Sequence, residues 1–142
     1  IKEDNLIKLK SLKVFAGTGE PQKAIMKLEV MGDVKEATES GDGPVDAIFK
    51  CIKKLYPHEV NLQLYNVHAV TEGTDAQATV SVRIEENGKT TVGQAANTDT
   101  LVASADAYLN ALNKLIIKRK KTAPEPMDLS DSKYIREKDG TI

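Results

Sequence analysis

The sequence predicts an α+β fold of two strand–strand–strand–helix (βββα) units related by a pseudo-twofold axis. Each antiparallel sheet is expected to be backed by one helix. Three observations support this prediction. Two stretches carry apolar residues at helical spacing, strand-like alternation precedes each of them, and the second half of the chain repeats the first after about fifty residues. Because an open solenoid needs at least ~3 repeats, two repeats favour a closed, paired arrangement.

Strands are predicted where apolar and polar residues alternate, since alternate side chains of a strand point to opposite faces. The predicted strands lie at 12–16 and 24–30 in the first unit and at 65–69, 79–84 and 90–95 in the second. Asn87-Gly88 is the strongest short hairpin signal and joins the last two of them. A third strand is expected in the first unit, between the turn at 31–33 and the first helix, because the repeat requires it.

Two helices are predicted, over 44–55 and from 100 to about 115, because each stretch carries an apolar stripe at three- and four-residue spacing. Proline suits the first helical position, and either Asp42 or Gly43 can cap the first helix. Asp99 stands at the matching start of the second helix.

The repeat defines the expected domain organisation. One domain covers 1–121, with repeat units of about 5–57 and 58–118, and a polar tail of different composition covers 122–142. The chain begins at Ile1 without a methionine, which predicts that it is a piece of a longer protein.

Composition limits the function classes. The 142 residues carry a net charge of −1, which gives no global field for nucleic acid or an anionic membrane. The single cysteine, Cys51, cannot form an intramolecular disulfide and is expected to be a small buried hydrophobe. Neither His58 nor His68 has neighbours at metal-ligand spacing, so no metal site is predicted. With no catalytic motif, signal peptide or membrane span evident, we expect a cytoplasmic binding domain.

The two helix starts suggest a ligand. A helix N-terminus offers unpaired N–H groups and partial positive charge, which suit a carboxylate, and 42–45 provides such a start with small residues. The carboxylate of Asp99 in the other repeat can accept an ammonium, so together they would hold a free amino acid. The alternative is that Asp42 and Asp99 are ordinary caps. Likewise, the small residues Ala76 and Ala78 mark either close packing or a pocket floor.

Three ordered motifs resemble one known family, the regulatory domain of α-isopropylmalate synthases. Residues 41–47, Gly-Asp-Gly-Pro-Val-Asp-Ala, resemble its GxGPxxA helix start, and 74–78 is similar to its DAQA strand. Residues 97–113 resemble its TDxxxASAxAYLNALN segment closely. The similarity extends over about 5–118.

The resemblance implies a homodimeric domain that binds a branched-chain amino acid between its two units, near the dimer interface. In the family this ligand inhibits a separate, metal-dependent barrel that condenses acetyl-CoA with a 2-oxo acid. That barrel is absent from these 142 residues. The resemblance therefore implies that the fragment is inactive alone and carries no cofactor of its own.

The resemblance also implies a set of effector-binding residues. Backbone around Val45 and Asp46 would meet the ligand's carboxylate, Asp99 its ammonium, and one strand its side chain. The predicted effector site consists of Asp42, Gly43, Pro44, Val45, Asp46, Leu62, Tyr65, Ala69, Ala76, Ala78 and Asp99. One departure is Asp46 itself, which stands where small or apolar residues are common in the family.

Three functions remain open at this point. The leading one is a leucine-binding regulatory domain of a 2-isopropylmalate synthase. The nearest alternative is the isoleucine-binding domain of citramalate synthase, because one repositioned methyl group is worth only ~1–3 kcal/mol in an apolar pocket. A dimerisation module without a ligand belongs to a different class and predicts no change in stability with any amino acid.

Overall fold

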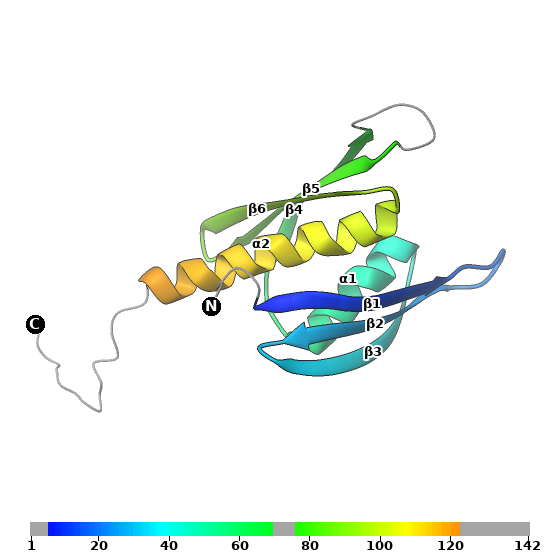
Figure 1. Cartoon of the computed structure of the whole chain (residues 1–142), viewed down its shortest axis with the longest axis horizontal. Helices are drawn as coiled ribbons and strands as arrows, with labels where there is room; N and C mark the ends of the chain where they lie inside the picture. Colours follow the sequence, from blue (N-terminus) through cyan, green and yellow to red (C-terminus); the bar gives the residue numbers. More distant parts are fainter. Residues whose placement is uncertain (1–5, 70–75, 123–142) are drawn as a thin grey trace, which may run out of the picture.

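The chain folds as two βββα units in sequence order (Figure 1). The computed structural model describes residues 6–69 and 76–122, without the side chains of Ala69 and of 120–122. The elements are β1 (Ile7–Phe15), β2 (Gln22–Val30), β3 (Asp33–Gly41), α1 (Pro44–Leu55), β4 (Asn61–Ala69), β5 (Ala78–Glu86), β6 (Lys89–Asn97) and α2 (Thr100–Thr122). The predicted fold class is therefore confirmed.

Each unit is a three-stranded antiparallel sheet, with strand orders β1-β2-β3 and β4-β5-β6. The predicted strands are found, although β1 starts earlier than 12–16 and ends before Ala16, and β6 extends to Asn97. The strand β3 carries little apolar alternation and could be expected only from the repeat. The helix α2 continues seven residues past the predicted end near 115. Residues 123–142 of the predicted tail lie outside the described residues.

The two units repeat in detail as well as in outline. Met31-Gly32 and Asn87-Gly88 link the last two strands of each sheet, and all four residues have positive φ, between 50° and 95°. Positive φ at both central positions is the type I′ geometry that matches strand twist. The first strands also share an irregularity, since the pairing register shifts between Leu9 and Ser11 and between Leu62 and Leu64. The pseudo-twofold relation thus includes the bulges.

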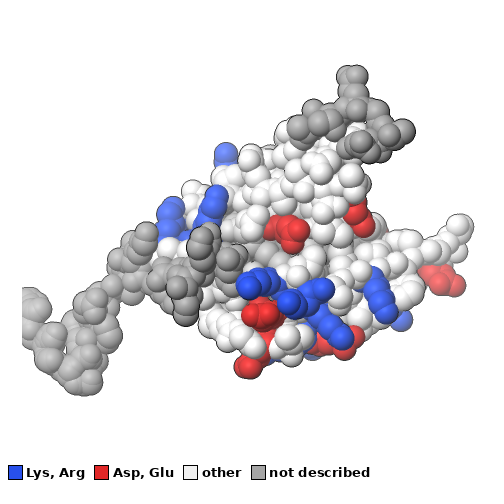
Figure 2. Space-filling view, in the orientation of Figure 1, with Lys and Arg blue, Asp and Glu red and all other residues white. Residues whose placement is uncertain are grey.

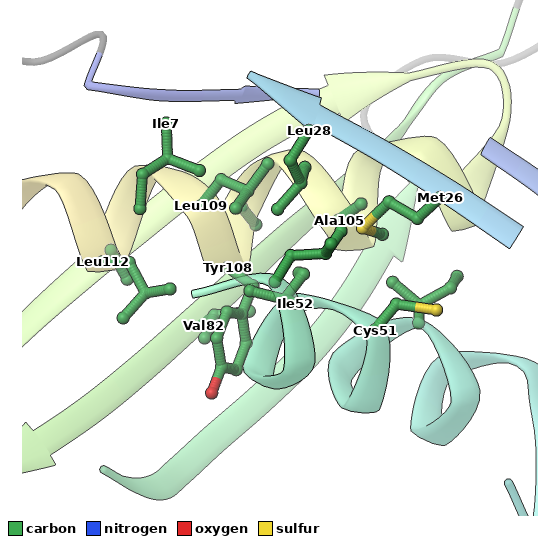
Figure 3. Packing of buried hydrophobic residues seen from close by; sticks show 14 of the residues in the cluster. Ile7, Met26, Leu28, Cys51, Ile52, Val82, Ala105, Tyr108, Leu109 and Leu112 are labelled. Carbon is green, nitrogen blue, oxygen red and sulfur yellow. The ribbon is translucent and has the colours of Figure 1, made fainter. Parts of the chain in front are cut away.

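The core is shared between the units. The helix α1 packs on β2 and β3, while α2 packs on β5 and β6 and also contacts β1 and α1. Figure 3 shows Met26 and Leu28 of β2 facing Leu109 of α2 and Ile52 of α1. All four side chains are buried. Removing these apolar surfaces from water is the dominant contribution to the stability of the fold.

Cys51 of α1 lies in this core, as predicted, with its side chain fully buried. Its thiol lies 3.4 Å from the carbonyl oxygen of Ala24 on β2 and 3.8 Å from that of Ala37 on β3. Burial raises the pKa of the Cys51 thiol to about 11. The side chain therefore stays a neutral thiol near pH 7 and serves packing.

A polar clamp joins the second helix to the first sheet. The side chain of Asn113 on α2 accepts a hydrogen bond from the Ile7 N–H at 2.9 Å and donates one to the Ile7 carbonyl at 3.0 Å. Both groups are buried, so the amide satisfies backbone atoms that would otherwise be costly to bury. The clamp fixes α2 against the start of β1.

The helix α2 lies unusually close to β6. Gly93 has no side chain, and a Cβ at that position would lie 2.1 Å from the Ala107 carbonyl oxygen and 2.4 Å from the Ala111 nitrogen. Beside it, the Thr91 hydroxyl donates to the Ala111 carbonyl at 2.9 Å. Only glycine permits this approach of helix and strand.

Replacing Gly93 by alanine should therefore lower the free energy of unfolding by roughly 3 kcal/mol or more, because helix and strand must move apart. The matched control is Gly43→Ala, where an added Cβ meets nothing within 4 Å and which should cost no more than ~1 kcal/mol. Chemical denaturation measures both values, and equal losses in the two variants would contradict the close-packing argument.

Candidate functional site

The start of α1 presents free backbone donors. Gly43 is the N-cap residue, in extended conformation, and no side chain caps the helix there. Pro44 follows at the first helical position, and the Ala47 N–H donates to the Gly43 carbonyl at 3.0 Å to close the first turn. By helix geometry the N–H groups of Val45 and Asp46 have no intrahelical acceptor. They are the donors that a carboxylate would use.

Of the two predicted caps of α1, Gly43 is confirmed, whereas the interpretation of Asp42 as an ordinary cap is wrong. Its N–H instead donates to the carboxylate of Asp46 at 3.0 Å, so this side chain reaches back to the residue before the N-cap. This hydrogen bond is the main reason that the pKa of Asp46 is lowered, and Lys50 at 3.2 Å lowers it further. The Asp46 carboxylate therefore interacts with groups of its own helix start. The backbone there is accessible because the N-cap residue, Gly43, has no side chain.

Asp99 is the N-cap of α2. Its Oδ1 accepts hydrogen bonds from the N–H groups of Leu101 at 2.9 Å and Val102 at 3.4 Å. Its own N–H donates to Oδ1 of Asn97 at 2.8 Å. The interpretation of Asp99 as a cap is confirmed, and its side chain lies in an exposed position. A role of this carboxylate toward an ammonium stays a prediction.

The inner face of β4 is open. The bulge at Gln63 brings Leu62 to the same face of the sheet as Tyr65 and Val67. These three residues are paired with buried residues of β5. Leu62 is 47% exposed and Val67 is 39% exposed, although both sit beside core residues. An apolar strand face left uncovered within a chain is a candidate binding surface.

The alanines predicted to shape the pocket lie at one end of this strand pair. Ala69, whose side chain lies outside the described residues, pairs through its backbone with Ala78. Ala76 precedes β5, and Ala76 and Ala78 are both half-buried. Thr74 and Asp75 of the same motif lie outside the described residues.

An aromatic and hydroxyl cluster connects β4 to both helices. The rings of Tyr65 and Phe49 of α1 pack edge to face, with 5.9 Å between their centroids. The centroids of Phe49 and Tyr108 of α2 are 4.5 Å apart. The Tyr65 hydroxyl lies 2.7 Å from that of Ser104, which donates to the Thr100 carbonyl at 2.8 Å. The cluster positions Tyr65 against the second turn of each helix.

Figure 1 shows both helices starting at the same end of the molecule. Tyr65 contacts Phe49 of α1 and Ser104 of α2, each one turn past its helix start. That Tyr65, 42–46 and Asp99 form one effector site stays a prediction. Sequence reasoning missed Phe49, Ser104 and Val67. Their spacing from predicted residues could have indicated them. Phe49, for example, lies one helical turn after Val45. A hollow of about 340 Å³ at the β1–β2 hairpin contains none of the predicted effector residues.

His58 is buried beside this cluster. Its Nδ1 lies 2.6 Å from the Tyr56 carbonyl oxygen and its Nε2 lies 2.9 Å from the Tyr108 hydroxyl. The consistent arrangement is a neutral ring in which Nδ1–H donates to the carbonyl and Nε2 accepts from tyrosine. Burial lowers the pKa of His58 and raises that of Tyr108 to about 12, so both groups stay neutral near pH 7.

Other site types find little support in the part of the chain that the structure describes. There, no three histidines, cysteines, aspartates or glutamates come together in a way that would hold a metal ion. No helix in the described ranges combines the length and apolar character that crossing a bilayer requires. The arrangement of helix starts, one carboxylate and an apolar strand suits the binding of a small zwitterion.

Comparison with known proteins gives one consistent result. A family model described as the LeuA allosteric (dimerisation) domain matches residues 1–116. The chain is 61% identical over 115 residues to a 2-isopropylmalate synthase of Bradyrhizobium diazoefficiens. It is 58% identical over 118 residues to that of Nitrobacter winogradskyi and 58% identical over 119 residues to that of Rhodopseudomonas palustris. These matches cover 81–84% of this chain but only 22–23% of each relative.

The lowered pKa of His58 predicts a loss of stability in acid. Because its pKa in the folded chain lies below the ordinary 6.5, the unfolded chain takes up the proton first as the pH falls through that value. The loss should level off below the folded-state pKa. Unfolding free energies between about pH 7.5 and 5.5 measure it. His58→Gln should remove this contribution, whereas exposed His68→Gln should keep it; an unchanged pH profile in both variants would refute it.

Proposed function

This chain belongs to the family of LeuA allosteric (dimerisation) domains, and we propose that it is the leucine-binding regulatory domain of a 2-isopropylmalate synthase. Bound leucine would inhibit a catalytic barrel, outside these residues, that condenses acetyl-CoA with a 2-oxo acid. The divalent metal would belong to that barrel, and the whole enzyme would be a cytoplasmic homodimer. The observation that carries the proposal is the open apolar face of β4, whose Tyr65 contacts both helices one turn past their starts.

The carboxylate of leucine would bind at the start of α1. The N–H groups of Val45 and Asp46 point out of the helix end, where the macrodipole favours negative charge. Gly43 carries no side chain, so a ligand can approach the backbone closely. The carboxylate of Asp46 is a like charge, but its pairing with the Asp42 N–H and with Lys50 offsets the repulsion.

The ammonium of leucine would bind at the start of α2. Oδ1 of Asp99 is occupied by the first N–H groups of the helix, which leaves Oδ2 to accept from the ligand. A charged hydrogen bond of this kind is stronger than a neutral one. The start of α1, in the first repeat, would thus bind the carboxylate of the amino acid, and the start of α2, in the second repeat, would bind its ammonium.

The isobutyl group of leucine would lie on the inner face of β4. Leu62, Tyr65 and Val67 offer apolar surface that the chain itself leaves partly exposed, and Ala78 leaves room beside them. Full burial of such a side chain contributes ~1.5–3 kcal/mol. Isoleucine differs by one branch point, so the shape of this face would decide between the two amino acids.

Regulation requires that leucine bind one state of the whole enzyme more tightly than another. The proposed site supports such a difference, because its parts come from both repeats and meet at Tyr65. A ligand bridging α1, α2 and β4 would stiffen the junction between the units. The lower mobility of this junction would change the mobility or arrangement of the catalytic barrel.

Leucine should raise the melting temperature of this chain, and isoleucine, valine and an unrelated amino acid should raise it less. A ligand at 100 times its dissociation constant adds ~2.7 kcal/mol to the free energy of unfolding. Thermal denaturation with each amino acid at millimolar concentration measures the shift. A stronger response to isoleucine would move the assignment to citramalate synthase, and no response in a folded dimer would favour a ligand-free module.

Asp99→Asn should weaken leucine binding by at least ~10-fold and leave the unfolding free energy within ~0.5 kcal/mol, because asparagine caps a helix about as well as aspartate. Calorimetric titration and chemical denaturation separate the two effects. The matched control is Asp33→Asn at the exposed start of β3, outside the predicted effector residues, which should leave the affinity unchanged. Equal affinity in the Asp99 variant and the wild type would remove Asp99 from the site.

A further inference from the structure

The first sheet has an outer face that the chain leaves exposed. Alternate residues of β2, from Ala24 to Val30, are buried on the inner face, where α1 packs. The residues between them, with their partners on β1 and β3, point to the opposite side. Figure 2 shows lysines gathered over the first sheet, with carboxylates among them. This outer face is a surface on which a charged ligand could lie.

Three exposed lysines surround Ile25 on this face. Lys13 on β1 is the cross-strand partner of Ile25, and Lys23 and Lys27 lie two residues before and after it on β2. Both are therefore diagonal neighbours of Lys13, a relation that places residues ~7–8 Å apart. No carboxylate of the described residues forms an ion pair with any of the three. Like charges this close repel one another, and a bound anion would remove that repulsion.

Two hollows of about 340 Å³ each border Ile25. Phe15 and Lys23 line the first hollow, at the β1–β2 hairpin. Lys13 and Lys27 line the second, which lies farther along the same face. Small-molecule pockets begin at ~300 Å³, so each hollow suits one part of a ligand, such as a ring system or a chain of phosphates. The lysines stand around both parts.

Phe15 adds an aromatic surface to the first hollow. Its side chain is 53% exposed, and the residue is the cross-strand partner of Lys23. Bases of nucleotides stack on exposed aromatic rings of this kind. Each hollow also has a carboxylate, Glu20 in the first and Glu36 in the second. These two groups can accept hydrogen bonds from the amino group of a base or from ribose hydroxyls.

We propose that the outer face of the first sheet binds an anionic nucleotide of the nucleoside di- or triphosphate class. The base would stack on Phe15 in the hairpin hollow, and the phosphates would lie among Lys13, Lys23 and Lys27. Lysine binds phosphate as a compact point charge, so three of them can hold a phosphate chain without a fixed fork geometry. The inference goes beyond the proposed function and does not depend on it, because this face contains none of the predicted effector residues.

Titration calorimetry of the 142-residue chain with ATP, tripolyphosphate and adenosine tests the proposal. The buffer contains no magnesium, which would compete with the lysines for phosphate, and has low ionic strength, because salt screens exposed charges. We expect ATP to bind at least ~5-fold more tightly than tripolyphosphate, since only ATP has a base to stack. Adenosine should bind most weakly, because it carries no charge.

Substitutions on the sheet separate the two parts of the site. Lys13→Gln and Lys23→Gln should each weaken ATP binding by ~3-fold or more, and the double variant by ~10-fold. The matched control is Lys8→Gln on the same strand, which lines neither hollow and should change the affinity less than ~2-fold. Phe15→Leu keeps an apolar side chain and should weaken ATP ~5-fold while leaving tripolyphosphate within ~2-fold. Chemical denaturation shows whether each variant is folded.

The wild-type measurements alone can overturn the proposal, so it does not depend on the folding of any variant. A chain that does not bind ATP overturns it, and equal affinities for ATP and tripolyphosphate overturn the assignment to a nucleotide. Tighter binding of a glutamate-rich peptide than of ATP would assign the face to an acidic protein segment instead. Equal losses in Lys8→Gln and Lys13→Gln would reduce the site to general charge attraction. None of these outcomes alters the expected response to leucine.

Discussion

The fold depends on one shared core, because neither three-stranded sheet can bury its apolar face alone. The helix α2 solves this problem for both units. It packs on β5 and β6 so closely that Gly93 is required, and it also contacts β1 through the Asn113 clamp. The sheet and helix of the second unit are therefore held in a fixed position against the first sheet. This fixes the position of the start of α2 relative to the first unit.

This arrangement breaks the symmetry that the repeat would otherwise give. The counterpart strands β1 and β4 are both first in their sheets, but β1 is covered near its start by α2 while the inner face of β4 is left open. The open apolar face consequently occurs in the second unit only, on β4, beside residues of both helices. The proposed ligand site therefore includes the strand that the core leaves uncovered.

The electrostatics of the chain fit a binding domain. The buried polar groups His58, Tyr108 and Cys51 have pKa values shifted toward their neutral forms, and burial is the first cause in each case. Charge near the proposed site comes from helix ends and from Asp99 and Asp46, both of which are already hydrogen-bonded to backbone N–H groups. Such a site offers complementary partial charges to a zwitterion and keeps its own groups in place.

The sequence by itself determined the two βββα units, the hairpin turn at Asn87-Gly88, both helix starts and the burial of Cys51. These features follow from local periodicity, turn chemistry and capping, which short segments carry within themselves. Only the tertiary structure decided that Gly43 and not Asp42 caps α1, and that a bulge at Gln63 aligns Leu62 with Tyr65. It also decided that Phe49 and Ser104 meet Tyr65. Register and helix crossing depend on partners distant in sequence, so no local pattern could specify them.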